Sequence, residues 1–135
     1  MKPFRKFNKD VPGEIEQFSK PILDSAYSVH TGLGPGLLEN TYELAMVHEL
    51  GKRGIKVQRQ VLLPVVYDGV DLGAGLKLDL LVEECIVVEL KAIESILPVH
   101  EAQLMTYLKL AKKRLGFLIN FNVASMKAGI DRVVL

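Results

Sequence analysis

The sequence predicts an α/β fold, because segments with helical spacing and segments with strand-like composition alternate along its 135 residues. The chain has the usual length of one domain, and 49% of its residues are apolar, which is enough for a sizeable core. The predicted order is two helices, a meander of strands, one further helix and two last strands. This order is that of a sheet flanked by helices.

The first two elements are predicted to be helices. Apolar residues recur at helical spacing from Glu14 to His30, and Pro21 is expected to kink or restart this helix. A break over residues 31–36, rich in glycine, separates it from a second helix that runs from about Leu37 to Arg53. Gly54 is the expected C-terminal cap of that helix.

The middle of the chain is predicted to be β structure. The run from Val57 to Tyr67 is rich in valine and leucine, and Asp68-Gly69 after it is a good hairpin turn. Pro64 inside this run indicates an edge strand or a bulge. The chain returns through Leu76–Val82, after a bend that Gly73-Ala74-Gly75 permits.

A second turn, at Glu83-Glu84, is predicted to join this strand to the next one, Cys85–Lys91. A third helix is predicted from Pro98 to about Lys113, because proline suits the first turn of a helix. Two strands are expected after it. They are a core strand over Leu115–Phe121 and an edge strand over Ile130–Leu135.

The residues most indicative of chemistry are Asp79 on one central strand and Glu89 and Lys91 on the next. Side chains alternate along a strand, so Glu89 and Lys91 should share one face, as should Lys77 and Asp79. The hairpin would bring Asp79 near Glu89. Two carboxylates and an ammonium group would then converge, which suits a hard divalent cation and a positioned water. The alternative is that both acids meet solvent at strand ends.

The helices contribute further candidates. Gln103 and Tyr107 are four residues apart on one face of the third helix, and His100 lies one turn before them. An amide and a hydroxyl suit a phosphate backbone or support of the lysine, although the border of an amphipathic helix would also carry such groups. Glu39, on the second helix, has a solvated surface position as its alternative.

Composition limits the classes of function. The net charge of +1 neither requires nor forbids a nucleic-acid partner, so a basic binding surface would have to be local. Residues 1–13 are expected to form a basic arm, and residues 14–135 a single domain. Cys85 is the one cysteine and cannot form an internal disulfide, which fits a cytoplasmic protein. We expect no membrane partner, since no apolar run is long enough to span a bilayer and the N-terminus lacks the apolar core of a secretion signal.

The segment Gly36-Leu37-Leu38-Glu39-Asn40-Thr41-Tyr42 resembles the motif that names the GxxExxY proteins. Asp79 and Glu89-Leu90-Lys91 follow in the order of that family, and so do the helical segment 103–107 and the closing segment 129–133. The resemblance covers nearly the whole chain after the basic arm. The GxxExxY family is grouped with the PD-(D/E)XK nuclease superfamily.

This resemblance implies a PD-(D/E)XK nuclease-like core of α-β-β-β-α-β order, with a central mixed β-sheet flanked by helices. It implies that Asp79 and Glu89 bind Mg²⁺ or Mn²⁺, that Glu39 completes the acidic site from its helix, and that Lys91 positions the attacking water. The expected activity is metal-dependent hydrolysis of phosphodiesters in nucleic acid, with DNA expected rather than RNA.

Gln103 and Tyr107 match the Gln-x-x-x-Tyr helix of RecB-like members of the superfamily. Two positions depart from the pattern: Leu78 stands where the superfamily name has proline, and Lys77 stands where the family usually has arginine. Lysine keeps the charge at that position but lacks the bidentate fork of arginine. Neither departure removes an expected ligand.

A second function of a different class is a non-catalytic module that keeps the nuclease fold and binds nucleic acid or protein. The complete set of Asp79, Glu89 and Lys91 favours the enzyme. The near-neutral charge favours the binding module, or an enzyme that works with a protein partner or as a homo-oligomer. A metal-dependent cleavage assay distinguishes the two classes.

Overall fold

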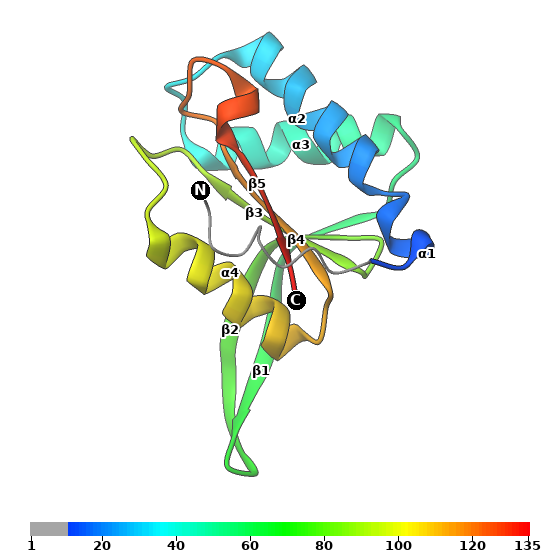
Figure 1. Cartoon of the computed structure of the whole chain (residues 1–135), viewed down its shortest axis with the longest axis vertical. Coiled ribbons are helices and arrows are strands. Elements are labelled where there is room, and N and C mark those ends of the chain that lie inside the picture. The colour runs from blue at the N-terminus through cyan, green and yellow to red at the C-terminus, as the bar shows by residue number, and fades with distance from the viewer. Residues whose placement is uncertain (1–10) are drawn as a thin grey trace.

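The structure is a computed structural model and describes residues 11–135, so most of the predicted basic arm (1–13) lies outside the described residues. Helices and strands alternate along these residues as the sequence predicts (Figure 1). In chain order the elements are α1 (Gly13–Glu16), α2 (Ser19–Leu33), α3 (Glu39–Lys52), β1 (Val57–Tyr67), β2 (Val70–Val82), β3 (Ile86–Lys91), α4 (Pro98–Ala111), β4 (Leu115–Asn120), the 3-10 helix η2 (Met126–Gly129) and β5 (Ile130–Val134).

The five strands form one sheet in the order β1-β2-β3-β4-β5. Strands β1, β2 and β3 pair antiparallel, and β5 pairs antiparallel with β4. Strands β3 and β4 are parallel and are joined by α4, which makes the long crossover that a parallel pair requires. The sheet is therefore mixed, and the predicted α/β class with helices flanking a mixed sheet is confirmed.

Helices cover both faces of the sheet, with α2 and α3 on one face and α4 on the other (Figure 1). Alternate residues of β3 divide between the two layers: Val88 and Leu90 pack with α2 and α3, whereas Val87 packs with α4. Such a strand is apolar on both sides, which explains the unbroken apolar run in the sequence. Both layers are needed to bury it.

The first predicted helix is interrupted at residues 17 and 18, before the position of Pro21. Helix α1 ends at Glu16, and α2 begins at Ser19, so Pro21 is the third residue of α2. The first four N–H groups of a helix have no acceptor within it, so proline is tolerated there. Arg132 of β5 donates a hydrogen bond to Glu16 and lies 5.9 Å from the ring centre of Phe117. These contacts link the end of α1 to the sheet.

The hairpin of β1 and β2 extends well beyond the helices as an arm (Figure 1). Asp68 and Gly69 at its tip have φ angles of 53° and 75°, the left-handed conformation that this two-residue turn requires. β1 is an edge strand, and its register with β2 shifts between Leu63 and Pro64, as the proline predicted. The arm carries exposed apolar side chains on both strands, namely Leu62, Val66, Tyr67, Val70 and Leu72.

Candidate active site

The two central strands separate where the predicted acids lie. β2 pairs with β3 from Val82 opposite Ile86 to Leu80 opposite Val88. Beyond these residues β2 follows β1 into the arm, while β3 continues beside β4 to Lys91 (Figure 1). The strands thus form a fork, and the next residue of each strand past the last pair carries a carboxylate.

Asp79 and Glu89 bridge this fork through two crossed hydrogen bonds. The Asp79 N–H donates to Glu89 Oε2 over 2.8 Å, and the Leu90 N–H donates to Asp79 Oδ2 over 2.9 Å. Both N–H groups lie where the ladder between the strands has ended, and a buried N–H group requires an acceptor. The two carboxylates provide these acceptors, so the structure brings Asp79 and Glu89 together as predicted.

The alternation of side chains along β2 breaks at Asp79, which the sequence did not predict. Leu78 packs with the helix α4 layer, yet Leu80, two residues later, packs with the α2 and α3 layer. On β1, Gln60 lies between the pairs Arg59–Leu80 and Val61–Leu78 and has a φ of 51°. Irregularities of this kind re-aim side chains beside active sites. Strict alternation therefore does not run through Asp79, and the shared face of Lys77 and Asp79 stays a prediction.

Burial and the charges of neighbouring carboxylates favour the neutral forms of Asp79 and Glu89. Glu89 is only 5% exposed, and burial, followed by the charge of Asp79, raises its pKa to about 8. Burial also raises the pKa of Asp79, against the opposing effect of the Leu90 N–H bond. The Lys91 ammonium lowers the pKa of both groups. A pair of this kind, with Glu89 buried and Asp79 half-buried, is a candidate functional site.

Glu39 is the third carboxylate beside this pair. It lies in the first turn of α3, where partial burial and then the charge of Asp79 raise its pKa, while Lys91 lowers it. The structure therefore places Glu39 within electrostatic reach of Asp79 and Lys91. This agrees with its predicted place beside the other two acids.

Tyr42 holds the segment that leads into α3. Its hydroxyl donates to the Gly34 carbonyl over 2.6 Å and accepts from the Leu37 N–H over 3.0 Å. Its ring is fully buried and stacks on Phe121, with ring centres 4.5 Å apart. Tyr42 thus fixes where α3 begins, and so where Glu39 lies.

Asn120 fixes the chain that leaves Lys91. It lies opposite Lys91 in the parallel ladder and is 2% exposed. Its side chain donates to the Ile93 carbonyl over 2.9 Å and accepts from the N–H groups of Ile93 and Asn122. Asn120 could not be identified as a site residue from the sequence, because its partners are known only once β3 and β4 are paired.

The predicted residues of α4 and β2 have different surroundings. Tyr107 is half-buried, and its pKa is raised by burial and then by the charges of Glu89 and Asp79, which places it beside the site. Gln103 is exposed. His100 Nδ1 accepts from the Leu97 N–H over 2.8 Å and so caps the helix. Lys77 is exposed, and its charge lowers the pKa of Asp79.

Glu43 is a further acid that was not predicted from the sequence; it lies one turn after Glu39 on α3 and is buried. Its carboxylate contacts Arg59 and Gln60 of β1. The available signal was the spacing of four residues from Glu39, which places both acids on one face of the helix. The strand partners could not be identified from that spacing.

The donor chemistry of the site fits a hard divalent cation. Asp79 and Glu89 each use one oxygen to accept a backbone N–H, and the second oxygen of each carboxylate remains for a ligand bond. A cation would also favour the ionised forms of Glu39, Asp79 and Glu89, whose pKa values are raised first by burial and then by neighbouring carboxylates. Within residues 11–135, however, no group of three or more His, Cys, Asp or Glu side chains is arranged to hold a metal ion.

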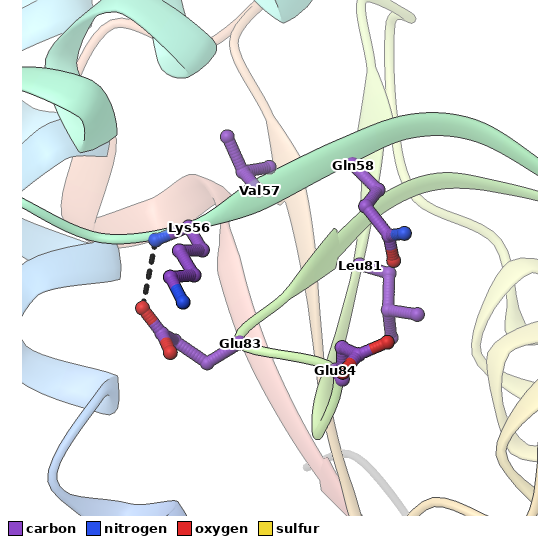
Figure 2. Close-up of a pocket in the computed structure, with 6 residues that line it drawn as sticks. All are labelled: Lys56, Val57, Gln58, Leu81, Glu83 and Glu84. Carbon is purple, nitrogen blue, oxygen red and sulfur yellow. Dashed lines mark hydrogen bonds between the residues drawn. The ribbon is translucent and has the colours of Figure 1, made fainter.

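A surface hollow lies at the other end of the β2–β3 pairing, around the turn at Glu83 (Figure 2). The Lys56 N–H donates to Glu83 Oε2 over 2.7 Å, and the Glu83 N–H donates to the Lys56 carbonyl over 2.8 Å. None of the predicted site residues lines this hollow. Its lining consists of Lys56, Val57, Gln58, Leu81, Glu83 and Glu84.

Over residues 11–135, no helix has the length and apolar character needed to cross a bilayer. Comparison with curated proteins and with solved structures gave no match. A family model described as the PD-(D/E)XK nuclease superfamily matches residues 16–133, which is most of the chain and includes every residue of the acidic site. The chain therefore belongs to the PD-(D/E)XK nuclease superfamily.

Proposed function

We propose that this protein is a metal-dependent nuclease of the GxxExxY type that hydrolyses phosphodiester bonds in nucleic acid, with DNA as the expected substrate. The observation that carries the proposal is the pair of crossed hydrogen bonds in which Glu89 accepts the Asp79 N–H and Asp79 accepts the Leu90 N–H, with the charge of Lys91 acting on both carboxyl groups. A pair of acids held in this way costs stability, which is typical of a site kept for function. Membership of a nuclease superfamily supports the assignment of phosphodiester hydrolysis to this site.

Asp79 and Glu89, with Glu39, would hold Mg²⁺ or Mn²⁺ through their free carboxylate oxygens. The bound cation would polarise the phosphate and lower the pKa of a coordinated water. The Lys91 ammonium would orient the attacking water and stabilise the negative charge that develops on the phosphate. The Tyr107 hydroxyl, beside the two acids, would bond to a phosphate oxygen.

Cleavage of single- and double-stranded DNA and RNA, measured with Mg²⁺ and with chelator, tests this proposal. Lys91→Ala should lower the rate by at least about 100-fold, since it removes the group that positions the water. Lys20→Ala is the matched control, because Lys20 is exposed on α2 and pairs with Asp24. Metal-independent cleavage, or full activity of Lys91→Ala, would contradict the proposed mechanism.

Metal binding can be followed separately from cleavage. Mg²⁺ or Mn²⁺ should raise the melting temperature of the wild type, because a ligand of the folded state stabilises it. Asp79→Asn should reduce this shift, since it removes one ligand charge at nearly constant shape. Lys91→Ala should keep the shift or enlarge it. A non-catalytic module would give no metal-dependent shift, and the three proteins would then behave alike.

A further inference from the structure

Helix α3 presents two acids to the site, and they have different surroundings. Glu39 lies in the first turn of α3 and retains exposure to solvent. Glu43 lies one turn later and is only 4% exposed. Its charge acts on both Asp79 and Glu39, so it lies beside the acidic site without being one of the predicted ligands.

Both oxygens of Glu43 already have partners on β1. Arg59 approaches Oε2 with Nη2 at 2.8 Å and with Nε at 3.0 Å, and Gln60 Nε2 donates to Oε1 over 2.5 Å. Arg59 Nη2 also lies 3.5 Å from Asn40 Oδ1, in the first turn of α3. Arg59 therefore reaches two successive turns of the helix. A carboxylate saturated in this way is better placed as an anchor than as a metal ligand.

The β1 backbone is shaped to make these contacts. Gln60, which lies opposite Asp79, has a φ of 51°, a conformation that side-chain-bearing residues seldom adopt. The irregularity directs the Gln60 amide to α3 at the point where β2 carries Asp79. One short segment of β1 thus pairs with the strand that bears Asp79 and also holds the helix that bears Glu39.

We propose that Glu43 is a positioning residue. Its ion pair with Arg59 and its hydrogen bond with Gln60 hold helix α3 so that Glu39 faces Asp79. The inference rests on the proposed function in so far as the positioned groups bind a cation. Arg59 also offsets part of the negative charge that Glu43 adds to the site. Removal of Arg59 should weaken cation binding if Arg59 positions Glu39, and should strengthen it if Arg59 acts through its charge alone.

The test is the affinity for Mn²⁺, measured by calorimetry well below the melting temperature of each variant. Arg59→Met removes the cation that pairs with Glu43 and leaves only the Gln60 contact, so an effect of charge alone would tighten Mn²⁺ binding. Loss of positioning should instead weaken it by about tenfold, as is usual when a group that supports a metal ligand is removed. Arg59→Lys keeps the charge and loses the guanidinium geometry, so it should also bind Mn²⁺ more weakly than the wild type.

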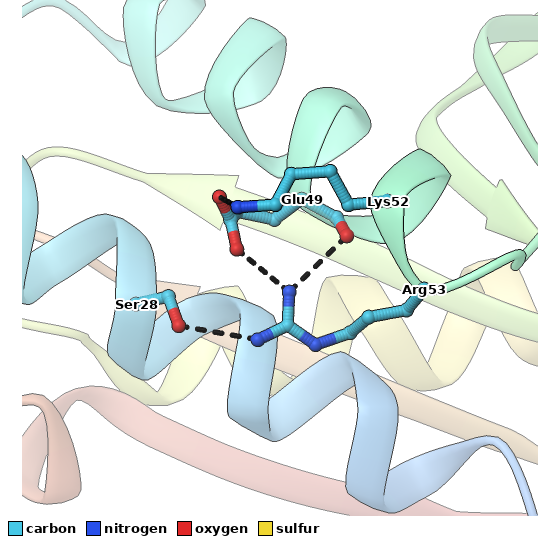
Figure 3. Close-up of polar contacts among 4 residues, drawn as sticks. All are labelled: Ser28, Glu49, Lys52 and Arg53. Atoms are coloured by element: carbon cyan, nitrogen blue, oxygen red, sulfur yellow. Dashed lines mark hydrogen bonds and ion pairs between the residues drawn. The ribbon is translucent and has the colours of Figure 1, made fainter.

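Arg53→Met is the matched control. Arg53 Nη1 donates to Glu49 Oε1 over 2.6 Å and Arg53 Nη2 to Ser28 Oγ over 3.2 Å, so it ties the far end of α3 to α2 (Figure 3). Its removal deletes an arginine–glutamate pair of the same helix away from the site. Arg53→Met should therefore keep the wild-type affinity. Tighter or unchanged binding by both Arg59 variants would overturn the proposal.

Amide hydrogen exchange of the metal-free proteins separates this proposal from the proposed function. Arg59→Met should speed exchange at residues 43–46 of α3 more than at residues 26–29 of α2, because only α3 loses its contact with Arg59. If the wild type binds no Mn²⁺ while this local effect is present, the metal-dependent function fails and the anchoring role stands. An equal change in exchange rate in both helices would overturn the anchoring role.

Discussion

The two ends of the β2–β3 hairpin use the same contact in different surroundings. At the turn, Glu83 Oε2 accepts the Lys56 N–H over 2.7 Å. At the fork, Asp79 Oδ2 accepts the Leu90 N–H over 2.9 Å. In each case a carboxylate supplies the acceptor for a backbone N–H on a neighbouring segment. The hydrogen bonds are thus alike in kind and length.

The ends differ in burial and in the number of charges that converge. Glu83 and Glu84 line a hollow at the surface (Figure 2), whereas Glu89 is 5% exposed and lies against Asp79, with Glu39 nearby. Burial favours a neutral carboxyl group, and a second carboxylate favours it further. A hydrogen-bonded acid is therefore not in itself a site. A site requires that acids be buried together, at a cost that a bound cation would remove.

The largest expected effect comes from Glu89→Gln. Burial and the charge of Asp79 raise the pKa of Glu89 in the folded state from 4.5 to about 8. Ionisation of Glu89 therefore costs the wild type no folding stability below about pH 4.5 and its full cost above about pH 8. Stability due to this group is thus lost as the pH rises through that window. Glutamine is always neutral. The free energy of unfolding of Glu89→Gln should therefore rise relative to that of the wild type as the pH rises, by a few kcal/mol above about pH 8.

Urea unfolding between pH 5 and pH 9 without metal measures this gain. Mg²⁺ should reduce the difference, since it would stabilise ionised Glu89 in the wild type alone. Glu83→Gln, at the exposed end, should cost only about 0.5–1 kcal/mol through one weakened hydrogen bond. If the advantage of Glu89→Gln does not depend on pH, Glu89 is not the buried, charge-coupled group inferred from the structure.

A smaller effect is expected from Asn120→Ala. The side chain is buried and bonds to both polar backbone groups of Ile93 and to the N–H of Asn122, so its removal leaves these groups without that partner. The free energy of unfolding should fall by roughly 2–3 kcal/mol. The chain after Lys91 should also become more sensitive to protease. A loss no larger than that of Glu83→Gln would mean that water replaces the Asn120 contacts.

The parts of the fold that depend on neighbouring residues could be predicted from the sequence. The bounds of β1 were predicted as observed, and the turn at Asp68-Gly69 and the separate turn at Glu83-Glu84 have the left-handed residues that such turns need. A short hairpin brings its two strands together, so the meeting of Asp79 and Glu89 also followed from local sequence. Roles in metal binding and catalysis remain predictions.

Contacts that depend on strand register or on distant pairing could not be predicted. An unbroken ladder from the pair Tyr67–Val70 would have placed Gln58 opposite Asp79, but two register shifts around Pro64 place Gln60 there instead. Register therefore decides which side chain reaches Glu43. Asn120 meets the chain after Lys91 only because β3 and β4 pair in parallel through α4, and the sequence does not state that pairing.

The smallest expected effect concerns the backbone. Both the fork and the turn have a residue in the left-handed conformation. Gln60 has a φ of 51° at the fork, and Glu83 has a φ of 50° at the turn. A Cβ atom in this conformation costs about 1 kcal/mol, which glycine avoids. At each position the glycine variant should therefore be more stable than the alanine variant by about 1 kcal/mol, although glycine normally weakens a strand. Each comparison removes the same side-chain contacts in both variants, so urea unfolding isolates the backbone contribution. A glycine advantage at Glu83 without one at Gln60 would mean that Gln60 is not held in the left-handed conformation, and its amide would then not be directed at Glu43.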